Sequence, residues 1–140
     1  MSAITCGQAQ ADLRQLAEDS GVAEHVVITG QVPEDELPAH YAAGDVFAMP
    51  CRERRGGLEV EAFGIVFIQA QAVGRPVVAT RAGGVPEFTH DGEDAVLVTP
   101  GDAAELAACL DRLLGDDDER LRLSRGALAS VERFALARHA

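Results

Sequence analysis

The chain has 140 residues, a length that fits one domain, and 47% of them are hydrophobic, which is enough to bury a core. Its formal charge of −11 and its lack of any Lys argue against a broad nucleic-acid surface, because clustered basic residues hold phosphate backbones. The three cysteines are too few and scattered for a disulfide framework or a CxxC metal site. With no signal-peptide pattern and no apolar run long enough to cross a bilayer, we expect a reduced, cytoplasmic protein.

The first third of the chain predicts a strand, a helix and a second strand, in that order. Residues 3–6 are β-prone, and Leu13, Leu16 and Ala17 then share a helical face that ends at Gly21. Residues 26–29 form a short β-branched run before Gly30, which is typical of a strand buried in a parallel sheet.

The middle of the chain continues the alternation. A helix containing Leu37 and Tyr41 tolerates Pro38 in its first turn, and a strand over residues 45–50 follows. The next helix is expected from about residue 63 or 64 to Gly74, and residues 76–80 form the next strand.

The last third predicts a loop over residues 83–87 that opens a short helix, a strand over residues 95–98 and two further helices. Asp102 and Glu105 resemble a capping box, and the acidic run 116–119 suits a solvated helix start better than a metal site. The whole pattern predicts an α/β fold: a Rossmann-like parallel sheet with helices on both faces, which binds ligands at the carboxyl ends of its strands.

The most informative segment is residues 56–70, in which a glycine-rich loop leads through acidic residues into an apolar helix. Glycines let the backbone approach a phosphate closely, and the first helical turn offers amides that its own carbonyls cannot satisfy. We therefore expect an anionic, phosphate-bearing ligand. Arg52, Arg54 and Arg55 beside this loop either steer that ligand or form a merely solvated loop.

Four segments in this order, residues 32–50, 56–61, 74–80 and 83–87, resemble the C-terminal, donor-binding half of a retaining GT-B glycosyltransferase of family 4. The resemblance covers about residues 6–128. The sequence of the loop, residues 56–61, is most similar to that of bacterial mannosyltransferases that use GDP-mannose on phosphatidylinositol lipids. It implies a donor half of the GT-B fold that lacks its first strands, over residues 1–140 as a single, N-terminally truncated domain.

The resemblance also implies the site residues. Glu61 lies at the donor sugar, and Gln69 stands eight positions later, where the family has a glutamate that binds the ribose hydroxyls. A neutral acceptor in place of a charged one costs roughly 1 kcal/mol. The backbone amides of Phe63, Gly64, Ile65 and Val66 face the sugar and distal phosphate, and Gly30 and Val32 mark the nucleobase region.

Each of these residues also has a purely structural interpretation. Glu61 also suits the helix dipole, Gly64 tight packing of the helix on the sheet and Gln69 a buried polar position bonded to backbone. The four histidines show no ligand spacing, and we expect neither a metal nor a cofactor.

The implied reaction moves a hexose, with mannose as the candidate, from GDP-mannose or a UDP-hexose to an acceptor hydroxyl with retention. The acceptor half and the family's Arg–Lys pair for the leaving diphosphate are both missing, so we expect another subunit or a longer parent to supply them. Peripheral membrane association would come only through that missing half.

Two other interpretations remain open. One is a non-catalytic domain that binds nucleotide sugar or a partner subunit, and the other is a sugar-nucleotide epimerase of the same architecture. A sheet without its leading strands also predicts self-association through an exposed edge or face.

Overall fold

The computed structural model describes residues 3–51 and 64–139. The chain divides into two compact units, Met1–Glu36 and Leu37–Ala140. Among the described residues, none of the helices combines the length and the apolar character that a bilayer crossing needs.

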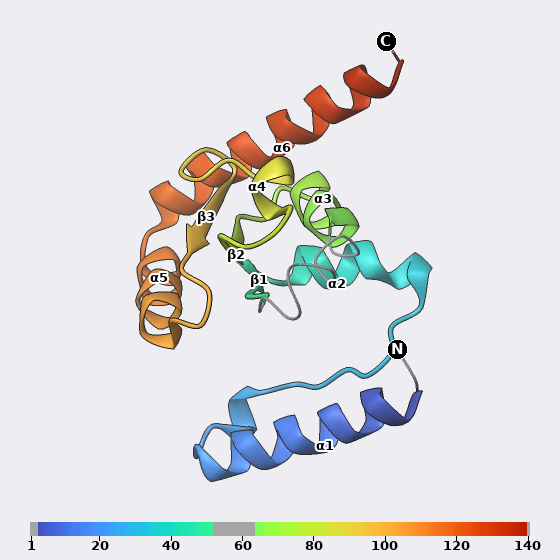
Figure 1. The fold of residues 1–140 in the computed structure, drawn as a ribbon, viewed down its shortest axis with the longest axis vertical. Coiled ribbons are helices and arrows are strands. Elements are labelled where there is room, and N and C mark those ends of the chain that lie inside the picture. The colour runs from blue at the N-terminus through green and yellow to red at the C-terminus, as the bar shows by residue number, and fades with distance from the viewer. Residues whose placement is uncertain (1–2, 52–63, 140) are drawn as a thin grey trace. The chain divides into compact units, whose positions relative to one another are not determined.

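The described part of the first unit contains one long helix and two short 3-10 helices. Helix α1 (Ala3–Asp19) precedes the 3-10 helix η1 (Ala23–His25), and a second 3-10 helix, η2 (Glu34–Glu36), ends the unit (Figure 1). The predicted end of α1 at Gly21 is confirmed: this glycine has φ 69°, and the amides of Gly21 and Val22 donate to the carbonyls of Glu18 and Ala17 at 3.0 Å. These bonds form a Schellman motif, which satisfies carbonyls at the helix end.

The two strands predicted in this unit are wrong. Residues 3–6 form the first turn of α1, because the Ala- and Gln-rich sequence that follows favours a helix and recruits them. Val26 has the extended angles φ −116° and ψ 124°, but residues 26–29 pair with no described strand. Val26 thus has the extended conformation that a β-branched side chain favours, whereas a strand also requires a hydrogen-bonded neighbour.

The second unit is built on a parallel sheet, as predicted, and in the described residues this sheet has three strands. Strands β1 (Phe47–Met49), β2 (Val77–Thr80) and β3 (Ala95–Val98) lie in the order β1-β2-β3, with Phe47 opposite Val77 and Val77 opposite Ala95. Its helices are α2 (Leu37–Ala43), α3 (Gly64–Ala72), α4 (Val85–Phe88), α5 (Ala103–Gly115) and α6 (Asp117–His139).

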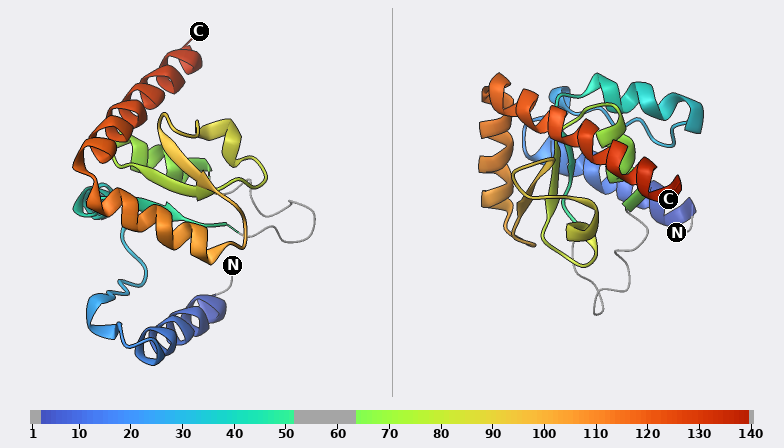
Figure 2. Two further views of the ribbon diagram at one scale, coloured as in Figure 1. Left: turned by 90° about the vertical axis from the view of Figure 1, so that its left-hand side faces the viewer. Right: turned by 90° about the horizontal axis from the view of Figure 1, so that it is seen from above.

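Helices cover both faces of the sheet, as Figure 2 shows. Alternate residues of each strand point to opposite faces, so each face has its own apolar cluster. On one face Val77 and Leu97 pack with Phe67 of α3 and Val85 of α4. On the other face Val78 and Val98 pack with three residues of α5 and α6: Cys109, Leu113 and Leu123.

The N-terminal ends of α5 and α6 are capped by side chains. The Asp102 carboxylate accepts from the Glu105 amide at 2.9 Å, and the Glu105 carboxylate accepts from the Thr99 amide at 2.8 Å. In a capping box the Glu105 carboxylate would bond the amide of the N-cap residue, Asp102, but here it bonds the amide of Thr99, three residues earlier. Asp116 accepts from the amide of Glu119 at 2.9 Å, which confirms the acidic run as a helix cap.

A single side chain closes the corner between α5 and α6. The guanidinium of Arg120 donates to the carbonyls of Leu113 at 2.6 Å and Leu114 at 2.8 Å, and it also pairs with Asp117. Carbonyls in the last turn of a helix have no partner within that helix, so this arginine on α6 completes the end of α5.

Helix α6 lies unusually close to the turn before β3. A Cβ atom added at Gly126 would overlap the carbonyl oxygen of Glu93 and lie 2.8 Å from its carbonyl carbon. Next to this contact the buried carboxylate of Asp94 accepts from the His90 amide at 2.7 Å, from His90 Nδ1 at 2.9 Å and from the Ser130 hydroxyl at 2.6 Å. Close approach and hydrogen bonds together fix α6 on the sheet.

We expect Gly126→Ala to lower the free energy of unfolding by about 2 kcal/mol or more, because the added methyl group meets backbone atoms that cannot rotate away. Chemical denaturation measures the change. Gly115→Ala is the matched control, since a Cβ there meets nothing within 4 Å, and it should change stability by less than about 0.5 kcal/mol. Equal stability of the two variants would contradict the close contact.

Candidate functional site

The carboxyl ends of the three strands meet at one edge of the sheet, as the parallel pairing requires. A cavity of about 220 Å³ lies at this edge. At this edge, the Thr80 hydroxyl donates to the carbonyl of Cys51 at 2.7 Å and ties the second residue after β1 to the end of β2. The residues that line the cavity are Pro50, Thr80, Val98, Thr99, Gly101, Asp102, Ala103 and Leu106.

Helix α3 begins at Gly64, within the predicted start at residue 63 or 64. Gly64 is buried, Val66 is half-buried and the side chain of Ile65 is exposed. The first amides of α3 have no acceptor within their own helix, so this turn can offer donors to an anion.

Gly64 also has a packing role, but toward helix α4, where the interpretation from sequence had named the sheet. A Cβ at this position would lie 3.0 Å from Cζ of Phe88, and the Phe88 ring stacks on Phe134 of α6 with centroids 6.4 Å apart. A contact of 3.0 Å is tighter than an ordinary van der Waals contact, so glycine lets α4 approach the start of α3. Phe88 is a residue that the sequence reasoning missed.

Gln69 lies one turn further along α3 and is half-buried. Its side-chain oxygen accepts a hydrogen bond of 3.1 Å from the hydroxyl of Tyr41 on α2. Its partner here is thus a side chain, whereas the structural interpretation from sequence had expected backbone. Burial raises the pKa of the Tyr41 phenol, which keeps the hydroxyl protonated as a donor.

The remaining predicted site residues lie elsewhere. Glu61, Phe63 and the arginines at positions 52, 54 and 55 fall outside the described residues. Gly30 and Val32 belong to the first unit: Gly30 has φ 69°, and a Cβ there would lie 3.5 Å from Nε2 of Gln10. The structure therefore brings Gly64, Ile65, Val66 and Gln69 together on α3, and their roles toward a ligand stay predictions.

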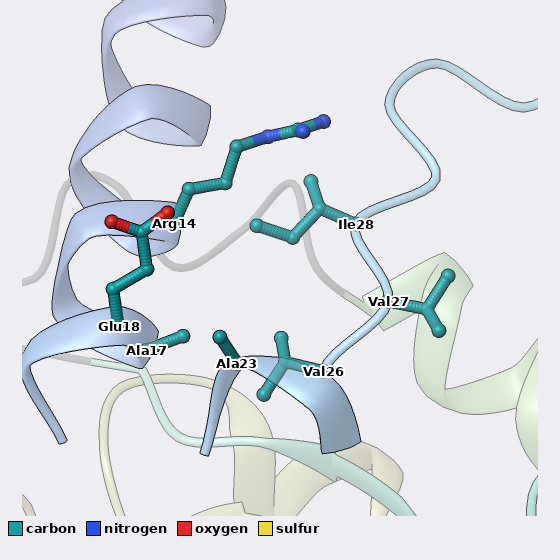
Figure 3. Close-up of a pocket in the computed structure, with 7 residues that line it drawn as sticks. All are labelled: Arg14, Ala17, Glu18, Ala23, Val26, Val27 and Ile28. Carbon is teal, nitrogen blue, oxygen red and sulfur yellow. The ribbon is translucent and has the colours of Figure 1, made fainter. Parts of the chain in front are cut away.

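A second cavity, of about 360 Å³, lies within the first unit between α1 and the segment of residues 23–28 (Figure 3). Arg14 and Glu18 stand one turn apart on α1 and supply its charge. Its other lining residues are Ala17, Ala23, Val26, Val27 and Ile28. These side chains are all apolar, so the cavity offers one guanidinium and one carboxylate against a hydrophobic wall.

The described cysteines are structural. Cys51 and Cys109 are free and buried, and burial raises the pKa of both thiols, which makes them poor nucleophiles. Within the described ranges, no group of three or more His, Cys, Asp or Glu residues is arranged to hold a metal ion.

Comparison with known proteins identifies the family. The sequence model of the glycosyl transferases group 1 family matches residues 2–116. The chain belongs to this family. It is 51% identical to the GDP-mannose-dependent alpha-(1-6)-phosphatidylinositol monomannoside mannosyltransferase of Mycolicibacterium smegmatis over 104 residues. These residues are 74% of this chain and 27% of the relative. The protein of that name from Mycobacterium tuberculosis is 47% identical over 111 residues, 79% of the chain and 29% of the relative.

Solved structures of glycosyltransferases share the fold. The sucrose-phosphate synthase of Thermosynechococcus elongatus superposes with a TM-score of 0.77 at 27% identity, over 90% of this chain and 30% of that one. The Anabaena protein HepE in complex with UDP-glucose superposes with a TM-score of 0.74 at 26% identity, over 92% and 36% of the two chains. These comparisons confirm the α/β, Rossmann-like fold of a GT-B glycosyltransferase. The chain spans less than a third of the length of the two mannosyltransferases that it matches.

We expect Gly64→Ala to destabilise the protein by about 1 kcal/mol or more, because its methyl group presses on the Phe88 ring. Combining it with Phe88→Leu, which replaces the ring by a smaller side chain, should recover part of the loss relative to Phe88→Leu alone. Urea unfolding of the four proteins measures both effects. A Gly64→Ala variant as stable as the wild type would show that the ring does not depend on this glycine.

Proposed function

We propose that the chain is the nucleotide-sugar-binding part of a retaining glycosyltransferase that moves a hexose from a nucleoside diphosphate sugar to an acceptor hydroxyl. The observation that carries the proposal is the start of α3 at Gly64, in the connection that leaves the carboxyl end of β1. Membership of the group 1 family supports it. Because the mannosyltransferase relatives are named as GDP-mannose-dependent, GDP-mannose is the first donor to test.

The chemistry of the helix start suits a diphosphate. An anion at a helix N-terminus gains about 0.3–2 kcal/mol from the dipole, in addition to its individual hydrogen bonds with the amides. Gly64, Ile65 and Val66 would supply these amides, Gln69 would contact the ribose and Gly30 and Val32 the nucleobase. Glu61 would lie at the sugar, where the diphosphate leaves and the acceptor hydroxyl enters on the same face.

Transfer also requires groups that stabilise the departing diphosphate, and removal of such donors costs about 10²–10³ in rate. The chain has no Lys to take part in the family's basic pair. We therefore propose that a longer polypeptide or another subunit supplies both these groups and an acceptor-binding half. Any contact with a membrane would be made by that half, and the buried, free thiols of Cys51 and Cys109 suit the reducing cytoplasm.

The lack of lysine favours one alternative, a domain that binds nucleotide sugar without turning it over. Calorimetry of the chain with GDP-mannose, UDP-glucose and UDP-N-acetylglucosamine tests binding. A transfer assay on the same sample then separates enzyme from binder. Absence of binding to all three donors would refute both the transferase proposal and this alternative.

We expect Ile65→Glu to weaken binding of GDP-mannose by about 3- to 10-fold, because the exposed side chain would bring a carboxylate beside the amides that receive the phosphate. The control is Leu121→Glu, which makes the same change at an exposed leucine near the start of α6. Calorimetry should give wild-type affinity for this control. Equal loss in the two variants would point to net charge and not to the start of α3.

Gln69→Glu restores the charged acceptor that the family carries at this position. We expect up to about a tenfold gain in affinity for the nucleotide, since a carboxylate hydrogen-bonds a ribose hydroxyl roughly 1 kcal/mol more strongly than a neutral amide does. Gln15→Glu, on the exposed surface of α1, adds the same charge as a control. A gain that is the same in both variants, or a loss in Gln69→Glu, would contradict the ribose contact.

A further inference from the structure

We propose that Tyr41 is a positioning residue for nucleotide recognition: its hydroxyl fixes the side-chain amide of Gln69 so that the nitrogen end meets the ribose. This inference rests on the proposed function of Gln69. It assigns a role to a residue of α2 for which the sequence suggested only a place in a helix.

The bond joins two elements that are far apart in the sequence. Tyr41 and Gln69 are separated by 28 positions, and α2 packs against α3 beside the sheet (Figure 1). The distance of 3.1 Å from the Tyr41 hydroxyl to Gln69 Oε1 is that of an ordinary hydrogen bond, and it lies in a partly buried region where solvent competes less.

The ring of Tyr41 is held independently of this bond. It meets the ring of Phe47 edge-on with centroids 5.5 Å apart, and Phe47 meets Phe67 of α3 in the same manner at 6.2 Å. Tyr41 and Phe47 also pack against the apolar cluster that covers this face of the sheet. The hydroxyl is therefore presented from a fixed ring, and it orders the amide at little cost in its own side-chain entropy.

The bond decides which end of the amide serves a ligand. A glutamine side chain has one acceptor and one donor end, and it can exchange them by a half-turn of its last torsion. Tyr41 engages the oxygen, and this bond does not use the nitrogen. Gln69 would then donate to a ribose hydroxyl oxygen, whereas a glutamate at this position could only accept from the hydroxyl.

The substitution Tyr41→Phe separates this role from packing, because it keeps the ring and removes only the hydroxyl. The experiment is calorimetric titration of the wild type, Tyr41→Phe, Gln69→Ala and the double variant with GDP and with 2′,3′-dideoxy-GDP, with the UDP pair in parallel. For the nucleotide that binds, we expect the wild type to prefer the ribose form by about 5- to 10-fold. Tyr41→Phe should lower this preference by about 3-fold and leave the affinity for the dideoxy form unchanged.

In the Gln69→Ala background, Tyr41→Phe should have no further effect on the preference, because the amide that it orients is gone. A Tyr41→Phe variant that binds both forms equally more weakly, or that keeps the wild-type preference, would overturn the role of Tyr41 while nucleotide binding stands. A wild type that binds nucleotides but does not distinguish the two forms would overturn it as well. A wild type that binds none of the four nucleotides would refute the proposed function, and the role of Tyr41 with it.

Discussion

The arrangement of the second unit depends on the burial of β2 on both faces. Every residue of this strand is at most 3% exposed, with α3 and α4 over one face and α5 and α6 over the other. Parallel pairing on both edges then forces the three carboxyl ends to one side, and each connection must leave from there. The start of α3 is therefore placed beside the ends of the strands by the packing of apolar residues distant from any ligand.

The sequence predicted this unit well because several local signals agreed. Pro76 before β2, the β-branched run that follows and Gly74 after α3 mark the same boundaries. Asp102 and Asp116 predicted the starts of α5 and α6 for the same reason, since a cap is a local interaction with the backbone amides next to it. The site residues on α3 follow from these boundaries and from the resemblance.

The failures have a different physical origin. Residues 26–29 have the composition of a buried strand, but a strand is defined by its neighbours, and a single sequence does not reveal whether a neighbour is present. The contacts of Tyr41 with Gln69 and of Phe88 with Gly64 were missed because each joins residues more than 20 positions apart. The scarcity of aromatic residues was the available signal: in a chain with one Tyr and five Phe, only six such rings can pack on a glycine, and the Tyr hydroxyl is the only one on a ring that can bond a polar side chain.

The hydrogen bonds of Arg120 at the corner hold α5 and α6 in one relative orientation. Only Asp116 separates the two helices; its carboxylate binds an amide of α6, while Arg120 reaches back to two carbonyls of α5. With α5 seated on the sheet, the last turns of α6 extend past the strands in a fixed direction (Figure 2). A partner that binds those turns would therefore transmit force directly to the sheet through α6 and α5.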